Sequence, residues 1–310
     1  MRAIAIENYG GIEQLKEIEA PLPEVGPKDI LIEVYASAIN PVDIAIREGY
    51  FKERVAHEFP VVLGYDVAGV VAAVGSDIKK FKVGDEVYSY TSLDRNGTYA
   101  EFVAVNEEFV ALKPSNLSFV EAASVPLVGI TAWHALVKEA IVKEGQKVLV
   151  LGGSGGVGSF AVQLAKAQGA IVSATTSTKN SELVKELGAD FVLDYTKESL
   201  PASEYDVIFD TVGGYQIKEL VGATKEDGKI ISITSRLSPT SQQLVDAKGI
   251  HYNLIFSSPD GESLDQLSTL LSKGKIRPVV GTIFSLSDVK EAHLLSESKR
   301  AVGKIVIQVK

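Results

Sequence analysis

The glycine-rich segment Gly152–Gly158 constrains the fold more than any other part of the sequence. It directly follows the apolar run Val148–Leu151, and five of its seven positions are glycine. Glycine loses more backbone entropy on folding than any other residue, so this concentration indicates a backbone that needs tight turns or close contacts. The spacing is G-x-G-x-x-G, and the following stretch, 158–168, carries apolar residues at helical spacing. The sequence therefore predicts a strand, a glycine turn and a helix.

Strands and helices alternate from Lys147 onward. The helices include 158–168 and 180–187, and the strands are expected at 147–151, 170–175, 190–194, 206–210, 229–234 and 250–256. Apolar strands separated by helices are typical of βαβ units, which build a parallel sheet covered on both faces. The fold class is therefore α/β, with a doubly wound Rossmann sheet in this part of the chain.

In this context the glycine turn predicts a dinucleotide-binding site. The first glycine permits the turn, the second allows the backbone to approach a pyrophosphate, and the third allows close packing of helix and strand. The free N–H groups at the start of the helix, together with its macrodipole, then hold the phosphates. The residues expected to bind cofactor here are Gly153, Ser154, Gly155, Gly156, Val157 and Gly158.

The segment Ser173–Asn180 indicates which dinucleotide is bound. An NAD site usually places an acidic residue about 20 residues beyond the glycines, to bind the ribose 2′-hydroxyl. Here no acid occurs before Glu182, whereas Thr175, Ser177 and Lys179 offer hydroxyls and a cation. Hydroxyls and lysine bind a 2′-phosphate that a carboxylate would repel. The alternative is that Lys179 is only a solvated residue at a helix start. The expected cofactor is NADP(H).

The first 115 residues are rich in strands and turns, so we expect a second, β-rich domain. Asp29–Asn40 is β-branched and largely alternating, and Val61–Gly75 has the pattern of a buried strand pair punctuated by glycine. Ser118 and Glu121 form a capping-box signature for a helix. The C-terminal tail returns to a strand–helix–strand pattern.

Composition excludes several function classes. The formal net charge of −9 argues against nucleic-acid or anionic-membrane binding by bulk electrostatics. There is no secretory signal pattern and no apolar run of about 18 residues, so we expect a soluble, cytoplasmic protein without a membrane span. Cysteine is absent, and no two of the four histidines have H-x-x-x-H spacing. We therefore expect neither thiol chemistry nor a metal site.

The motifs together resemble a known family. The motifs that carry this resemblance are "LGYDVAGVVAAVG" (Leu63–Gly75), "NPVD", "IREGYF", "VGDEVY", "GTYAEFV" and "GGSGGVG". Through them the chain resembles the zinc-independent quinone oxidoreductases and alkenal/enone reductases of the medium-chain dehydrogenase/reductase superfamily. The resemblance implies a GroES-like domain from residues 1–119 and 275–310 and an inserted Rossmann domain, 120–274, with the active site between them. Zinc-dependent members carry Gly-His-Glu where this chain has Gly64-Tyr65-Asp66.

The resemblance also implies roles for individual residues. Asn40 would lie beside the nicotinamide, and Tyr50 would line the acceptor site as a possible hydrogen-bond donor. Thr131 would lie near the nicotinamide end of the cofactor, and Tyr195 beside the adenosine 2′-phosphate. Local readings remain open for two of them, since Asn40 could simply begin a turn and Tyr50 could be a packing residue.

These features favour one reaction. Oxidising a simple alcohol requires a Lewis acid or a tuned base, and neither is evident in the sequence. A quinone or an α,β-unsaturated carbonyl accepts hydride without that help, because delocalisation places the new charge on oxygen. We expect an NADPH-dependent reductase of such acceptors. The alternative is a sensor or structural protein that binds NADPH without turning it over; a zinc-type alcohol dehydrogenase is nearly excluded.

The last predicted strand indicates assembly. Positions 250–256 would form an edge of the Rossmann sheet, yet no charge or proline interrupts them. A solvent-facing edge normally carries such residues against aggregation. Either a loop covers this edge, or it pairs with the same strand of a second subunit. We expect a homodimer, as the resemblance also implies.

Overall fold

The computed structural model describes residues 1–55, 57–234 and 236–310, which form two compact units. Unit 1 comprises Met1–Ile130, Ser258–Gly274 and Pro278–Lys310. Unit 2 comprises Thr131–Ser257 and Lys275–Arg277. Unit 2 is thus inserted between segments of unit 1.

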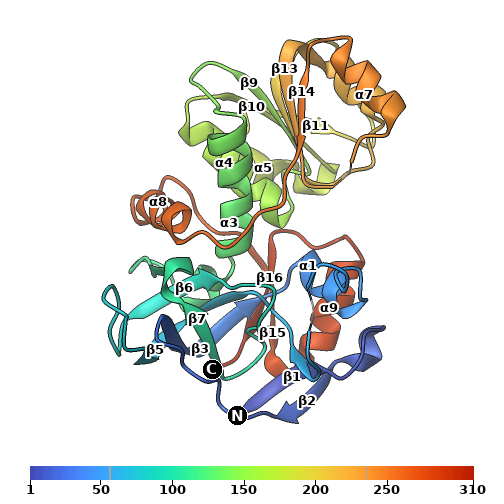
Figure 1. Cartoon of the computed structure of the whole chain (residues 1–310). Helices are drawn as coiled ribbons and strands as arrows, with labels where there is room; N and C mark the ends of the chain where they lie inside the picture. The colour runs from blue at the N-terminus through green and yellow to red at the C-terminus, as the bar shows by residue number, and fades with distance from the viewer. Residues whose placement is uncertain (56, 235) are drawn as a thin grey trace. The chain divides into compact units, whose positions relative to one another are not determined.

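Unit 2 contains a parallel sheet of six strands within the described residues. The strands are β9 (Lys147–Leu151), β10 (Ile171–Thr176), β11 (Phe191–Asp194), β12 (Tyr205–Asp210), β13 (Thr224–Ser232) and β14 (His251–Leu254). Their order is β11-β10-β9-β12-β13-β14, and every pairing is parallel. Several of these strands lie side by side in Figure 1. The doubly wound sheet predicted from the sequence is confirmed, and β14 is at its edge.

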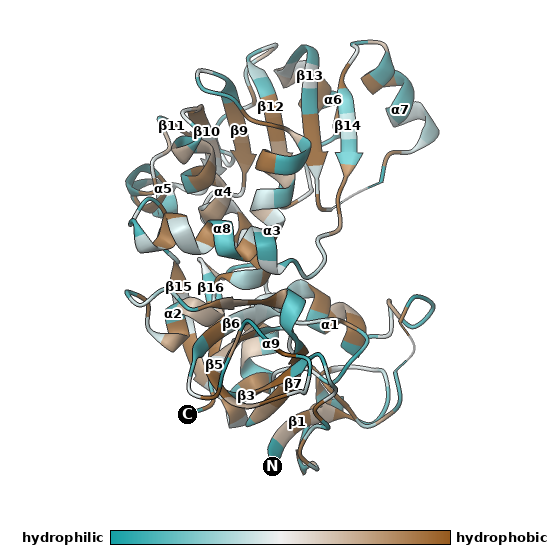
Figure 2. Cartoon of the chain, turned by 60° about the vertical axis from the view of Figure 1, so that its left-hand side comes forward, coloured by the Kyte–Doolittle hydropathy of each residue, from teal (hydrophilic) through white to brown (hydrophobic). Residues whose placement is uncertain are grey.

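The helices of unit 2 connect these strands and cover the sheet. They are α4 (Gly156–Ala167), α5 (Ser181–Glu186), α6 (Ile217–Ala223) and α7 (Pro239–Asp246), with short helical turns at η3 (His134–Glu139) and η4 (Thr178–Asn180). The central strands β9 and β12 are mainly hydrophobic, whereas the edge strand β14 is mainly hydrophilic (Figure 2). This gradient is expected because central parallel strands are buried on both faces.

Unit 1 is built on mostly antiparallel strands. The strands are β1 (Arg2–Ile6), β2 (Lys16–Glu19), β3 (Asp29–Ala38), β4 (Val61–Val62), β5 (Asp66–Val74), β6 (Glu86–Tyr90), β7 (Phe102–Asn106), β8 (Val110–Leu112), β15 (Val280–Ser285) and β16 (Lys304–Gln308). The larger sheet runs β15-β16-β3-β5-β6-β8, with β7 also pairing with β3. Because β16 pairs with β3, the C-terminal segment completes a sheet that the N-terminal segment begins.

Short helices complete unit 1. They are η1 (Ile12–Gln14), α1 (Pro41–Arg47), η2 (Glu107–Phe109), α2 (Phe119–Ala123), α8 (Gly261–Ser272), η5 (Leu286–Asp288) and α9 (Val289–Glu297), whereas α3 (Pro126–Trp133) crosses from unit 1 into unit 2. The capping box at Ser118 starts α2, as the sequence predicts. Within the described residues, no helix combines the length and apolar character that a membrane crossing requires.

The bounds of the units differ from the boundaries expected at 119/120 and 274/275. Helix α8 belongs to unit 1 because it packs on β8 and makes hydrogen bonds with strand β6 and with the loop after β8. The Tyr88 hydroxyl lies 2.7 Å from Ser268 Oγ, and Asn116 Nδ2 donates to the Leu271 carbonyl at 3.1 Å. These contacts between segments distant in the sequence place α8 in unit 1.

Candidate functional site

The glycine turn of unit 2 is fixed by the neighbouring strand β10. The backbone N–H of Gly152 donates to Thr175 Oγ1 at 3.0 Å, and the N–H of Gly153 donates to the Thr175 carbonyl at 2.9 Å. Gly152 has a φ of +78°, a backbone conformation that favours glycine. The tight turn therefore falls on Gly152, one residue before Gly153, the first motif glycine at which the sequence predicts it. The double glycine after β9 was the signal for this residue.

The third motif glycine is required by close packing, as expected. A Cβ on Gly158 would lie 2.1 Å from the carbonyl oxygen of Gly152, far inside contact distance. Gly153 is also tightly enclosed, since its Cβ would lie 2.8 Å from the Cβ of Ala174. The start of α4 therefore lies directly against the turn that follows β9.

The N-terminus of α4 offers an anion site. Gly155 is the N-cap and the first turn holds no acidic residue. The first N–H groups of a helix have no intrahelical partner and carry the positive end of the macrodipole. Ser154–Val157 are only partly buried, and within this range the Gly155 N–H donates to the Gly152 carbonyl at 3.0 Å. This arrangement fits a pyrophosphate.

Ser154 links the turn to the segment after β10. Its Oγ accepts hydrogen bonds from Thr176 Oγ1 at 3.0 Å and Asn180 Nδ2 at 3.2 Å. A hydroxyl has two acceptor lone pairs and one hydrogen. Because both lone pairs are occupied, the Ser154 hydrogen is oriented away from these partners and available to an anion.

Two lysines and one carboxylate follow strands β10 and β11, and only one of the lysines pairs with the carboxylate. Lys179 is exposed and makes no hydrogen bond or ion pair with any residue that the structure describes. Asp194, at the end of β11, accepts hydrogen bonds from the hydroxyls of Thr178 and Thr196 and pairs with Lys197 at 3.3 Å. The Thr178 hydroxyl is the main cause of a lowered pKa at Asp194. Sequence reasoning missed this carboxylate because it follows the third strand rather than the second.

The remaining expected cofactor residues have different environments. Thr175 is only 1% exposed, and its hydroxyl and carbonyl are used to hold the glycine turn. Ser177 is the N-cap of η4, and Tyr195, just after β11, is 57% exposed. Thr131 is buried in α3, where its hydroxyl lies 2.7 Å from Ser257 Oγ. Their roles toward the cofactor stay predictions.

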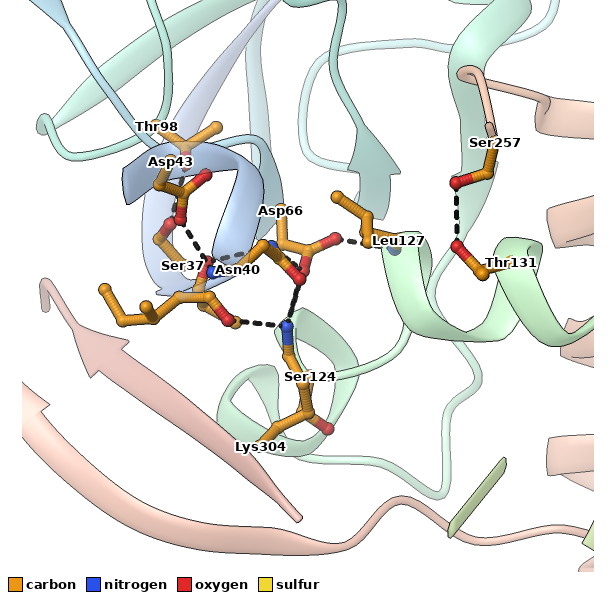
Figure 3. A network of polar contacts seen from close by, with 12 residues as sticks. Ser37, Asn40, Asp43, Asp66, Thr98, Ser124, Leu127, Thr131, Ser257 and Lys304 are labelled. Carbon is orange, nitrogen blue, oxygen red and sulfur yellow. Dashed lines mark hydrogen bonds and ion pairs between the residues drawn. The ribbon is translucent and has the colours of Figure 1, made fainter. Parts of the chain in front are cut away.

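Unit 1 contains a buried polar cluster around Asn40 (Figure 3). Asn40 Nδ2 donates to Asp66 Oδ2 at 2.8 Å, and its Oδ1 accepts from Lys304 Nζ at 2.6 Å. Lys304 Nζ also donates to the Ile39 carbonyl at 2.8 Å and lies 3.2 Å from Asp66 Oδ2. The other Asp66 oxygen accepts from the N–H of Leu127, near the start of α3. Every donor of the ammonium is satisfied.

A second chain of buried groups begins at Asp43. Its Oδ2 accepts from the Tyr99 hydroxyl at 2.6 Å and from the Asn40 N–H at 2.7 Å. His293 Nε2 lies 3.3 Å from the Tyr99 hydroxyl, and Arg47 reaches His293 Nδ1 at 3.3 Å. Burial raises the pKa of Asp43 to about 7 and lowers that of His293 to about 3. Only Asn40 of these residues was expected at a site.

The two expected catalytic residues are thus placed differently. Asn40 is 1% exposed and both ends of its amide are bonded within unit 1, whereas Tyr50, just after α1, is 77% exposed. Tyr50 is free of the core that would make it a packing residue. Asn40 is the N-cap of α1, and its backbone N–H donates to Asp43 Oδ2. This position agrees with the local alternative, in which Asn40 begins a turn of the chain.

The residues at Gly64-Tyr65-Asp66 do not fit a zinc site. Asp66, the one carboxylate of this tripeptide, is paired with the Lys304 ammonium, and that ammonium would repel a metal cation. Tyr65 is fully buried. Within the described residues, no three histidine, aspartate or glutamate side chains are grouped as metal ligands.

Comparisons with known proteins identify the family. Residues 26–115 match the alcohol dehydrogenase GroES-like domain, and residues 187–307 match the zinc-binding dehydrogenase domain. The chain is 42% identical to 2-methylene-furan-3-one reductase of Solanum lycopersicum and 40% identical to a chloroplastic NADPH-dependent alkenal/one oxidoreductase of Arabidopsis thaliana, in each case over 99% of this chain and 79% of the relative.

A solved structure agrees with these relatives. The quinone oxidoreductase from Coxiella burnetii superposes with a TM-score of 0.90 at 33% identity, over 100% of this chain and 99% of that one. The GroES-like and Rossmann domains predicted from the sequence are therefore confirmed as fold types. The chain belongs to the quinone oxidoreductase and alkenal/enone reductase branch of the medium-chain dehydrogenase/reductase superfamily.

Proposed function

We propose that the protein is a reductase that transfers hydride from NADPH to quinones or α,β-unsaturated carbonyls, without zinc. The names of its relatives support this activity, since they describe an NADPH-dependent alkenal/one oxidoreductase, a furanone reductase and a quinone oxidoreductase. The observation in this chain that carries the proposal is the glycine turn of unit 2 next to a segment that offers hydroxyls and Lys179 but no acid before Glu182.

The residues of unit 2 divide the binding of NADPH among them. The N–H groups at the start of α4, with Ser154 Oγ, would hold the pyrophosphate. Lys179 and Ser177 would bind the 2′-phosphate, because the lysine ammonium has no other partner among the described residues. Tyr195 would pack beside the adenosine. Thr175 acts through the turn that it holds.

NADPH supplies the hydride, and residues of unit 1 would stabilise the negative charge that develops on the acceptor oxygen. Hydride adds to an electron-poor carbon, the electron pair moves to the carbonyl oxygen, and a proton completes the reduction. The exposed Tyr50 hydroxyl is a donor for that oxygen, and water is the other source of the proton. Asn40 would lie beside the nicotinamide, with its amide orientation fixed by Lys304 and Asp66.

A panel assay tests this proposal. NADPH consumption is followed at 340 nm with a benzoquinone, a naphthoquinone, an alkenal and a cyclic enone, with NADH as the parallel cofactor. We expect turnover of at least one acceptor class and a preference for NADPH. Tight NADPH binding without turnover of any acceptor would favour the alternative, a sensor or structural protein. Failure to bind NADPH would contradict both.

We also propose a homodimer formed through the edge strand β14. Among the described strands, β14 pairs only with β13, and Phe256 just beyond it is 59% exposed. Antiparallel pairing about a two-fold axis would satisfy the backbone groups of both copies. Light scattering on the parent protein should report a dimer, and the double variant Asn253→Pro/Leu254→Lys should be monomeric or insoluble. A monomeric parent at micromolar concentration contradicts the proposal.

A cytoplasmic location is likewise a proposal. Relatives are named as chloroplastic, so the compartment has to be measured directly. Fractionation of cells of the source organism with an antibody to the chain tests it, and recovery in an organelle fraction would correct it.

A further inference from the structure

The dipeptide Asn96–Gly97 lies in the irregular segment that follows β6. Asn96 is the one asparagine of the sequence that is followed by glycine, and it is exposed. Glycine has no Cβ, so no side chain on Gly97 shields its backbone nitrogen from the side-chain amide of Asn96. In such a pair the nitrogen can attack the amide carbon Cγ and close a succinimide ring.

The structure turns both reacting groups of this pair toward Val62 in β4. Asn96 Oδ1 accepts from the Val62 backbone N–H at 2.9 Å, and the Gly97 N–H donates to the Val62 carbonyl at 2.8 Å. The side-chain amide and the nitrogen that would attack it therefore lie on the same side of the chain. Each group is also held by a hydrogen bond, so the arrangement that aligns them restrains them as well.

The reaction needs only water. The Gly97 nitrogen gives its proton to hydroxide and bonds to Asn96 Cγ, the bond from Cγ to Nδ2 breaks, and the leaving amide takes up a proton as ammonia. Water then opens the ring at either carbonyl, which yields aspartate or isoaspartate at position 96. While the Gly97 hydrogen is donated to Val62, the nitrogen is not free to attack, so this local pairing must open first.

The two products differ in their backbones. Aspartate retains the normal chain and a carboxylate oxygen that can accept from the Val62 N–H. Isoaspartate carries the chain through its Cβ and Cγ, which lengthens the backbone by a methylene group. The next residue has no room for this change, because a Cβ on Gly97 would already lie 2.1 Å from the Gly64 carbonyl oxygen.

The longer backbone would also affect the buried cluster of unit 1. The Thr98 N–H donates to the Gly64 carbonyl and the Tyr99 N–H to the Leu63 carbonyl, both at 2.9 Å. These bonds set the position of the Tyr99 side chain, whose hydroxyl donates to Asp43 at 2.6 Å. A shift in this register therefore weakens a contact in the core of unit 1.

We propose that Asn96 is a latent modification site, which converts spontaneously to isoaspartate, is protected by its pairing with Val62, and destabilises unit 1 once converted. The proposal is independent of the proposed function, because it involves neither NADPH nor an acceptor.

Deamidation rates of the folded and the unfolded chain test the protection. The parent protein is incubated in mildly alkaline buffer with and without guanidinium chloride, and peptide mass spectrometry follows each asparagine. We expect Asn96 to convert first in the unfolded chain and at least about tenfold more slowly in the folded protein. The control is Asn96→Gln, which keeps an amide oxygen but would have to close a larger ring, so position 96 should stay unconverted in both conditions.

The stability of the separated products tests the structural consequence. The unfolded parent is aged and refolded, and its isoaspartate fraction is isolated by chromatography and identified by labelling with protein isoaspartate methyltransferase. The matched control is Asn96→Asp, which has the same charge and a normal backbone. We expect Asn96→Asp to melt close to the parent, and the isoaspartate form to melt at least about 3 °C lower or to fail to refold.

Different results would overturn the separate parts of this proposal. Conversion of another asparagine before Asn96 in the unfolded chain overturns the choice of site. Equal rates in the folded and unfolded protein overturn the protective role of Val62. An isoaspartate form as stable as Asn96→Asp overturns the effect on unit 1.

Discussion

Lys304 Nζ lies 2.6 Å from Asn40 Oδ1, across 264 residues of sequence. The Lys304 ammonium can only donate, so it must face the amide oxygen of Asn40. The Asp66 carboxylate accepts a hydrogen bond from Asn40 Nδ2 at 2.8 Å, so the Asn40 amide has a single orientation. β16 brings Lys304 to this position by pairing with β3. The C-terminal strand therefore fixes the side chain that begins α1.

Replacing Lys304 by methionine should strongly destabilise the protein. The change leaves Asp66, which is fully buried, without its counter-charge, and breaking such a pair typically costs about 3–5 kcal/mol. Urea unfolding measured by circular dichroism gives the loss. The control is Lys310→Met, because Lys310 pairs with Glu33 at the surface, where an ion pair is worth about 0–1 kcal/mol. Similar losses in the free energy of unfolding of the two variants would show that the buried pair contributes no more to stability than the surface pair.

Asp43→Asn should change how stability depends on pH. Burial raises the pKa of Asp43 to about 7, above its unfolded value of about 3.9, so the folded state binds the extra proton between these values. In the parent, this proton adds stability as the pH falls from about 7 to about 4. His293 opposes it, because its lowered pKa leaves the folded state short of a proton below about 6.5.

The variant lacks the Asp43 contribution, so its free energy of unfolding should fall relative to the parent by about 1.4 kcal/mol per pH unit below pH 7. Denaturant unfolding at pH 4.5 to 8 measures the difference. Asp77→Asn replaces an exposed carboxylate, so the free energy of unfolding of this variant should follow the same pH dependence as that of the parent. A pH-independent difference for Asp43→Asn would mean that Asp43 does not titrate in this range.

Lys179→Ala should remove much of the preference for NADPH over NADH. A charge-assisted hydrogen bond to the 2′-phosphate is worth about 1.5–3 kcal/mol, which corresponds to roughly 10- to 100-fold in affinity. NADH binding should be unaffected, and salt should weaken NADPH binding to the parent more than to the variant. Fluorescence titration gives both constants. Lys185→Ala, which removes an exposed lysine paired with Glu182, should leave the preference unchanged. Equal affinities for both cofactors in the parent would refute the assignment.

Gly158→Ala should weaken NADPH binding and destabilise unit 2. The new Cβ would lie 2.1 Å from the Gly152 carbonyl oxygen, so α4 or the glycine turn must move. Gly222→Ala is the matched control, because a Cβ there meets nothing within 4 Å and should be neutral or slightly stabilising. Thermal unfolding and NADPH titration of both variants decide the matter, and a Gly158→Ala protein that binds like the parent would contradict the close packing.

Activity should survive prolonged treatment with a strong chelator. Asp66 stands where zinc-dependent members of the superfamily carry a glutamate, and its carboxylate forms an ion pair with Lys304. Elemental analysis of the purified protein should find no stoichiometric zinc. Loss of turnover that only added metal restores would overturn this expectation.

The sequence by itself determined the fold of unit 2 and the position of its glycine turn. The periodicity of strands and helices is a local property of the sequence. The glycine spacing marks positions where no side chain fits, as at Gly158, where a Cβ would lie 2.1 Å from the Gly152 carbonyl oxygen. The bounds of β9, the presence of β12 and the edge position of β14 could be predicted for the same reason. The choice of Gly152 for the tight turn depended on backbone angles that adjacent glycines leave open.

Only the tertiary structure decided what surrounds these residues. Lys304, Asp66 and Asn40 have no sequence signature as a group, because strands distant in the chain bring them together. Burial then sets the chemistry, since the same carboxyl group that ionises in water has its pKa raised to about 7 at Asp43. Long-range contacts and desolvation are properties of the folded chain, and no local pattern encodes them.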